Sequence, residues 1–154
     1  MVPSSPMTAF VAQAREYCSS VERAAALPLP ERLAVTRLRL LALYTAALDL
    51  PSVEPSDELA CEHEPHIPTN WPGFGEHDAY LEIFDPYIDE PPVGGSLSDD
   101  VCDVYLDLRR GLWLWDAGRT DDAIWEWRFH FEHHWGDHAI DALRALHRAC
   151  KAAT

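Results

Sequence analysis

The sequence predicts an all-α fold: a single-domain bundle of about five long helices with an ordered, acidic, proline-rich excursion. Apolar residues recur at three- and four-residue steps along most of the chain, which is the helical period. No stretch alternates clearly enough between apolar and polar residues to indicate a strand. A chain of 154 residues suits one domain that buries roughly 68–70% of its unfolded surface. We therefore expect residues 1–154 to form one helical domain without any sheet of three or more strands.

The segment 96–138, which holds five of the six tryptophans, is predicted to be the core helical hairpin. Ser96, followed by Asp99 at capping-box spacing, indicates where its first helix begins. Gly118 can adopt the left-handed conformation that ends a helix, and Thr120 is a plausible N-cap for the second helix. Because the second helix is apolar on two opposite sides, we expect it to be sandwiched between neighbouring helices.

Three further helices are expected around this hairpin. Residues 1–7 are predicted to be a loose tail, with Thr8 as the cap of the first helix. The second helix, about 30–50, has an apolar arc so wide that we expect it at the centre of the core. After the hairpin, Gly136-Asp137 should break or kink the chain before a last amphipathic helix.

The segment 51–95 differs in composition from the rest, with eight of the twelve prolines and four of the seven glycines. A structureless stretch of this length is unusual in a compact domain, so part of it should be ordered or functional. Residues 76–84 are compatible with a short helix. Three aromatic residues are expected to pin the segment to the helices: Trp71, Phe74 and Tyr87.

The net charge of −14 is unevenly distributed along the chain. No lysine or arginine occurs between Arg39 and Arg109, an interval that contains sixteen aspartates and glutamates. Such a field repels phosphate backbones, which argues against nucleic-acid binding, and it attracts metal cations or a basic protein partner. Most of these carboxylates are expected to form a solubilising surface.

The remaining composition points to a cytoplasmic protein. No apolar run is long enough to cross a membrane, and the first residues lack the basic end and apolar block of a signal peptide. The four cysteines are widely scattered without a C-x-x-C pair, so we expect free thiols rather than a disulfide framework or a zinc ribbon.

Two rows of ionisable residues on the hairpin are the candidate site. The first helix carries three aspartates four residues apart on one face: Asp99, Asp103 and Asp107. Like charges at this spacing cost about 0.2–0.5 kcal/mol per pair unless Arg110, Arg128 or a bound cation compensates them. The facing helix carries a second row at the same spacing: Glu126, His130, His134 and His138.

An antiparallel hairpin with equal rise along both helices would place the rows side by side. The expected pairs are Asp107 with His130, Asp103 with His134, and Asp99 with His138. Bundle proteins build metal centres from carboxylates and imidazoles at matched heights, although the E-x-x-H pair of ferritin-like sites is absent here. Asp–His hydrogen bonds without any metal produce the same pattern. We therefore expect structural pairing and no cofactor, with a divalent metal as the alternative.

Two weaker patterns also contain metal-binding residue types. The loop 61–66 combines a cysteine, two histidines and two glutamates, but sequence-adjacent side chains can seldom all face one ion. The pairs Glu82/Asp85 and Asp100/Asp103 are faintly similar to the acidic motifs of all-helical nucleotide pyrophosphohydrolases. A proline directly after the first pair and the lack of basic residues to hold phosphates argue against that activity.

Several motifs resemble an uncharacterised bacterial family catalogued only as a domain of unknown function. They are FDP at 84–86, SLxDD at 96–100, DxYxDL at 103–108, AIWEWRF at 123–129 and FExHWGxH at 131–138. The likeness covers roughly residues 84–143 and is faint in the first two helices. The resemblance implies an all-helical fold and a bacterial origin, and it implies no mechanism.

Two functions from different classes fit these observations. The leading hypothesis is a cytoplasmic, non-enzymatic helical protein that binds another macromolecule through the acidic segment 51–95, since loops on a rigid frame commonly carry function. The alternative is a divalent-metal-dependent enzyme, a hydrolase, that uses the two rows on the hairpin 96–138.

Overall fold

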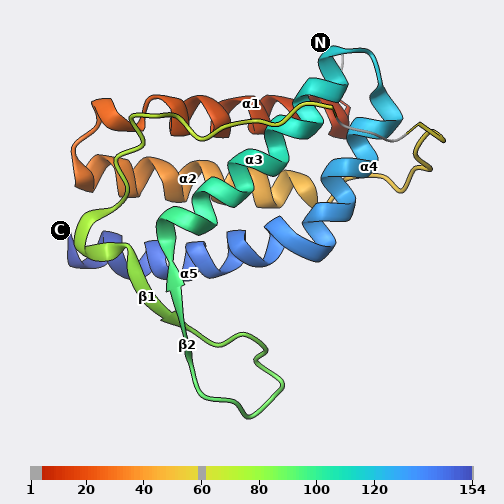
Figure 1. Cartoon of the computed structure of the whole chain (residues 1–154). Coiled ribbons are helices and arrows are strands. Elements are labelled where there is room, and N and C mark those ends of the chain that lie inside the picture. The colour runs from red at the N-terminus through yellow and green to blue at the C-terminus, as the bar shows by residue number, and fades with distance from the viewer. Residues whose placement is uncertain (1–4, 59–61, 154) are drawn as a thin grey trace.

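The computed structural model describes residues 5–58 and 62–153, and within them the chain is mostly helical (Figure 1). The helices are α1 (Pro6–Glu22), α2 (Leu29–Ala47), α3 (Leu97–Asp116), α4 (Thr120–His130) and α5 (Gly136–Ala152). Short helical turns are η1 (Ala24–Ala26), η2 (Gly75–His77) and the π-helical turn η3 (Phe131–Trp135). Two strands, β1 (Ala79–Glu82) and β2 (Val93–Ser96), form an antiparallel pair.

The strand pair corrects the all-α expectation, and it replaces the helix expected at 76–84. In β1 the alternation is inverted: Tyr80 and Glu82 are partly buried, whereas Leu81 between them is 75% exposed. A strand with polar groups facing the body does not show the apolar periodicity by which half-buried strands are recognised. The sheet has only two strands in the described part of the chain, as expected.

The first helix begins earlier than expected. Its N-cap is Ser5, whose Oγ accepts a hydrogen bond from the backbone N–H of Thr8 at 3.2 Å. Pro6 occupies the first helical position, where its missing N–H costs nothing. Thr8 therefore lies inside α1, and the predicted tail is wrong for its last three residues. Residues 1–4 lie outside the described part.

The ends of the predicted hairpin are largely confirmed. The Ser96 side chain caps α3 by accepting from the backbone N–H of Asp99 at 3.2 Å. Gly118 has a φ of +77°, which places it in the left-handed region. The second helix differs by one residue, because Arg119 is the N-cap and Thr120 is already helical.

Of the break or kink predicted at Gly136-Asp137, the break does not occur but the helix changes direction just before Gly136, and the expected count of five long helices becomes four long helical runs. The chain stays helical from α4 through η3 into α5, and Figure 1 shows α4 and α5 running in different directions on either side of η3. A Cβ on Gly136 would lie 2.1 Å from the carbonyl oxygen of Phe131. Glycine is therefore required where the π-helical turn ends, and the turn redirects the helix without interrupting it.

The centre of the core is Trp127, which is completely buried. Its ring lies 5.0 Å from that of Phe10 on α1 and 5.9 Å from that of Trp115 on α3. Its indole N–H donates to the carbonyl of Leu108 at 3.2 Å, and its own carbonyl accepts from the indole of Trp135 at 3.0 Å. One residue thus connects α1, α3, α4 and η3, through its side chain and its backbone carbonyl.

The second helix is not central, contrary to expectation. It packs on α1 and α5, and its outward face leaves Leu38 61% and Leu41 53% exposed, as is Leu48 directly after its end, at 63%. The two-sided burial expected for α4 also fails on one side. There Trp125 and Phe129 stack on each other with ring centroids 4.7 Å apart, and Phe129 remains 40% exposed. Apolar periodicity marks helices here, but it overestimates how much of each helix is covered.

The proline-rich segment is ordered wherever it is described. Phe74 is completely buried and Trp71 packs edge-on against it at 5.5 Å, as expected. Arg32 of α2 donates to the carbonyl of Gly73 at 2.6 Å and so ties the segment to the bundle. Tyr87 is instead 96% exposed, far from a plug. Among the helices of the described chain, none has the length and apolarity needed to cross a membrane.

Replacing Gly111 with alanine should destabilise the fold, because a Cβ there would lie 2.0 Å from Nε1 of Trp127. Overpacking of this kind costs about 1–3 kcal/mol. The matched control is Gly94→Ala, since a Cβ at Gly94 meets no atom within 4 Å. Chemical unfolding of both variants measures the difference. An unchanged or raised stability of the Gly111→Ala variant would contradict the packing described here.

Candidate functional site

Two aspartates on α3 are buried and each must be paired. Asp100 is 5% and Asp107 2% exposed, and a buried carboxylate is costly without hydrogen-bond partners. Asp107 contacts Nδ1 of His134 at 2.5 Å and accepts from Arg110 at 2.8 Å. Asp100 contacts Nδ1 of His138 at 2.8 Å.

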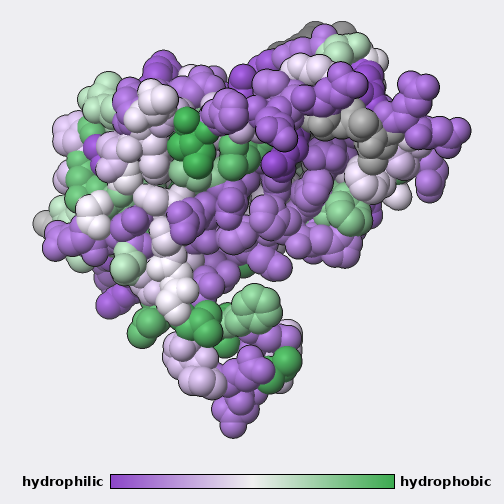
Figure 2. All heavy atoms as spheres, viewed as in Figure 1, coloured by the Kyte–Doolittle hydropathy of each residue, from purple (hydrophilic) through white to green (hydrophobic). Residues whose placement is uncertain are grey.

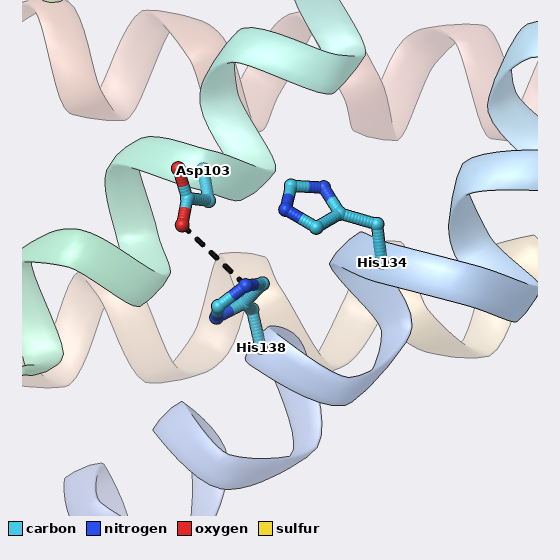
Figure 3. Close-up of side chains that lie close together, drawn as sticks. All are labelled: Asp103, His134 and His138. Carbon is cyan, nitrogen blue, oxygen red and sulfur yellow. Dashed lines mark ion pairs between the residues drawn. The ribbon is translucent and has the colours of Figure 1, made fainter. Parts of the chain in front are cut away.

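A third aspartate of α3 lies between these two pairs. Oδ2 of Asp103 is 3.4 Å from Nε2 of His138, and both side chains are about one-third exposed. Figure 3 shows Asp103 on α3 facing the rings of His134 and His138 across the gap between the helices. We call these three residues the Asp–His cluster. One ligand atom from each lies within 4.8 Å of the other two.

The rows therefore meet, but one helical turn out of the expected register. Asp107 pairs with His134 instead of His130. Asp103 forms its ion pair with His138 instead of His134, although the His134 ring also lies close to it. Two physical effects explain the offset. Helical side chains lean towards their own N-terminus, so on antiparallel helices the two rows lean in opposite directions. The π-helical turn also contains more residues per turn than an α-helix, which invalidates the assumption of equal rise.

The other predicted site residues do not join the cluster. Glu126 is buried and pairs with His130 one turn later on the same helix, with Oε1 3.2 Å from Nδ1. This hydrogen bond raises the pKa of His130, although burial acts in the opposite direction. Asp99 is exposed on the first turn of α3. Of the two expected compensating arginines, Arg110 does pair with the aspartate row, whereas Arg128 donates to the carbonyl of Leu50 at 2.9 Å.

Electrostatics within the cluster follow from these contacts. The hydrogen bond that His138 donates to Asp100 raises the pKa of His138, against the effect of burial, and the charge of Asp103 adds to the rise. Burial raises the pKa of Asp103, while His138 and His134 lower it. The carboxylates and imidazoles of the site thus shift one another's pKa values. Groups with perturbed pKa values of this kind are common at functional sites.

Sequence reasoning missed the contacts that Asp100 makes with His138 and Tyr80. The hydroxyl of Tyr80 donates to Asp100 and also contacts Glu82 at 3.0 Å. In the sequence, Asp100 was considered as a partner of Asp103 in an acidic pair and was left out of the row that faces the histidines. Its spacing of seven residues from Asp107 places both on the buried side of the helix, and that spacing was the available signal.

Residues 79–96, which comprise β1, β2 and the loop between them, form a projecting arm (Figure 1). Figure 2 shows hydrophobic side chains gathered on this arm, while the adjacent face of the body is mostly hydrophilic. The exposed apolar residues of the arm are Leu81 (75%), Ile83 (55%), Phe84 (81%), Tyr87 (96%), Ile88 (51%) and Val93 (43%).

The base of the arm is fixed to the helices. The backbone N–H groups of Leu97 and Ser98 donate to the carbonyl and carboxylate of Asp78, each at 2.7 Å. The Tyr80 ring covers Gly95 on β2, where a Cβ would lie 2.8 Å from the ring. Through Tyr80 and Asp100, the base of the arm also contacts the residues that hold the Asp–His cluster.

A pair of carboxyl groups also joins the arm to α5. Burial raises the pKa of Asp141 to about 7, and its hydrogen bond and charge interaction with Glu82 contribute to the rise. The folded protein therefore holds a proton on Asp141 at pH values at which the unfolded chain, with an aspartate pKa near 3.9, has lost it.

The pKa of Asp141 predicts how stability depends on pH. Between about pH 4 and 7 the folded state binds more protons than the unfolded state, so this group makes the free energy of unfolding fall as pH rises. Asp141→Asn should remove that part of the decline and stabilise the protein above about pH 7 relative to the parent. Denaturant unfolding across a pH series measures it. Asp89→Asn, at the exposed tip of the arm, is the control for loss of one negative charge, and parallel curves for all three proteins would refute the assignment.

Comparison with known proteins supports the fold and shows the family. The crystal structure of protein BF1032 from Bacteroides fragilis is similar, with a TM-score of 0.78 and 24% sequence identity over 95% of this chain and 92% of that one. Likeness at this identity concerns the fold alone. A search of curated proteins finds no match. A family model matches residues 72–151, which include the cluster, the arm and the predicted signature motifs, and the chain belongs to that family, described as Domain of unknown function (DUF5063).

Proposed function

We propose that this protein is a non-enzymatic interaction protein whose arm, residues 79–96, binds a basic protein partner. The observation that supports the proposal is the exposure of six large apolar side chains on one ordered projection. Contiguous apolar surface of this kind is uncommon on a soluble monomer and marks interaction sites.

The shape of the arm favours binding because it is set in advance. At its tip, the backbone N–H of Tyr87 donates to the Asp85 carboxylate at 2.9 Å, and that of Ile88 donates to the Asp85 carbonyl at 3.2 Å. An ordered loop loses less conformational entropy on binding than a disordered one. Tyr87 and Phe84, the two most exposed apolar side chains of the arm, are aromatic, and aromatic residues frequently dominate binding energy.

Charge restricts the class of partner. The arm carries four carboxylates and no lysine or arginine: Glu82, Asp85, Asp89 and Glu90. Such a surface is repelled by nucleic acid and by anionic lipid. The complementary partner is a protein with an apolar groove bordered by lysine or arginine, which would accelerate association and confer specificity.

The cysteines support a location in the cytoplasm. Cys18, Cys102 and Cys150 are free thiols, and unpaired cysteines are typical of a reducing compartment. Cys61, with which the loop pattern at 61–66 begins, lies outside the described residues. His63 of that pattern stacks on Trp113 with ring centroids 5.9 Å apart.

The proposal is tested with a photo-crosslinking amino acid at position 88, introduced in cells that express the protein, followed by mass spectrometry of the adduct. The adduct partner is then purified and its affinity measured. Changing both Phe84 and Tyr87 to serine should weaken binding by roughly 30-fold or more, the effect of losing about 2 kcal/mol at a binding hot spot. Added salt should weaken binding as well, because charged groups border the contact.

The matched control changes Leu38 and Leu41 of α2 to serine. These leucines are also exposed and apolar, so the control has the same chemistry on another surface. Equal loss in both double variants would point to general hydrophobic adhesion and overturn the proposal. Crosslinks confined to a second copy of this chain, or to lipid, would overturn it too.

A further inference from the structure

We propose that Asp103, His134 and His138 bind one divalent transition-metal ion, through the carboxylate of Asp103 and Nε2 of both histidines. This inference rests on the Asp–His cluster and is independent of the arm's function.

The first argument concerns which nitrogen of each ring is available. Nδ1 of His134 and Nδ1 of His138 each contact a buried carboxylate, at 2.5 Å and 2.8 Å. An ionised carboxylate only accepts hydrogen bonds, so each Nδ1 carries a proton and donates it. Nε2 is then the atom left on each ring for a second proton or for a metal ion. A carboxylate behind a histidine in this manner is the usual support of a metal-binding imidazole.

The second argument is distance. With a metal–nitrogen distance of about 2.0–2.1 Å, two ligand atoms of a tetrahedral site lie roughly 3.3 Å apart. Nε2 of His138 and Oδ2 of Asp103 are already 3.4 Å apart. One ligand atom of each of the three residues lies within 4.8 Å of the other two, so the side chains have to approach one another only slightly to hold an ion. The His134 side chain is 42% exposed and has room for that movement.

The third argument is access and charge. The side chains of Asp103 and His138 are 37% and 33% exposed, so an ion can reach them from solvent and keep water in its remaining positions. Behind them stand the carboxylates of Asp100 and Asp107, with Arg110 paired to the latter. Three carboxylates and one guanidinium leave this region negative when the rings are neutral, which favours a cation.

The donor set selects the class of ion. Two imidazoles and one carboxylate suit zinc and iron(II), whereas magnesium and calcium prefer oxygen ligands alone. Three protein ligands with open positions leave room for water or another small ligand on the metal. The two histidines are four residues apart in the run from η3 into α5, and Figure 3 shows both of their rings on the side that faces Asp103.

The experiment uses the full chain without an affinity tag, from which a chelator has removed any metal. Zinc is titrated into this protein in a calorimeter at about pH 8, because imidazole is neutral at that pH. One zinc ion per chain should bind, and excess magnesium should not displace it. Removing a residue that supports a metal ligand typically lowers metal affinity by roughly 10–100-fold. His138→Ala and Asp103→Asn, which remove ligands themselves, should each lower the zinc affinity by at least that much. Asp107→Asn leaves all three ligands in place but removes the support of His134, so it should lower the zinc affinity by roughly 10–100-fold.

The matched control is His133→Ala, since His133 lies on the same turn, is exposed and packs on Phe129. Its zinc affinity should equal that of the parent. Circular dichroism verifies folding of each variant, and Asp103→Asn alters a partly exposed side chain, so it remains informative if a histidine variant fails to fold.

A second readout identifies the ligating atoms. Nitrogen-15 NMR of the histidine rings should show zinc shifting Nε2 of His134 and His138 while each Nδ1 keeps its proton. Absence of saturable zinc binding overturns the proposal. Equal binding by His133→Ala and His138→Ala, or shifts at Nδ1 instead of Nε2, also overturns it.

Discussion

The packing of Trp127 against Gly111 is the contact on which the arrangement of this protein depends. Only a residue without a side chain lets the indole approach α3 so closely that its N–H reaches the Leu108 carbonyl. The same ring packs against Phe10 of α1, so Trp127 also holds the first helix against the α3–α4 hairpin. Trp135 then donates to the Trp127 carbonyl and fixes where the π-helical turn begins to redirect the chain.

The geometry of the candidate site follows from this packing. Once α4 is held against α3, the buried Asp100 and Asp107 need partners from the helix that passes them, because unpaired buried carboxylates are costly. His134 and His138 supply those partners with Nδ1. Satisfying the aspartates therefore turns both rings so that Nε2 faces Asp103. The structural pairing favoured from the sequence and a metal site are thus compatible, since the first creates the geometry of the second.

The sequence identified the three residues of the Asp–His cluster as candidates, but it did not predict which aspartate pairs with which histidine. Ser96 and Gly118 identified the ends of α3 because caps and left-handed glycines depend on local chemistry. The aspartate and histidine rows were found by their four-residue spacing. Their pairing was one turn out of register because it depends on side-chain direction and on a π-helical turn, which periodicity does not reveal. Gly136, where a break or kink was expected, is the residue that the π-helical turn requires.

The arm could not be predicted for a related reason. Its strand β1 places Tyr80 and Glu82 towards the body and Leu81 towards solvent, the reverse of an ordinary amphipathic strand. That inversion has a local cause, because Tyr80 hydrogen-bonds to Asp100 and Glu82 interacts with Asp141 on the side facing the body.

The tyrosine hydroxyl and the His138 ring use the same carboxylate, so a change in the charge carried by that ring alters the field at the base of the arm. Burial and the Asp100 contact both raise the pKa of Tyr80, which keeps its hydroxyl a donor to this carboxylate. Asp100 is therefore the residue through which the exposed apolar arm and the Asp–His cluster are physically connected.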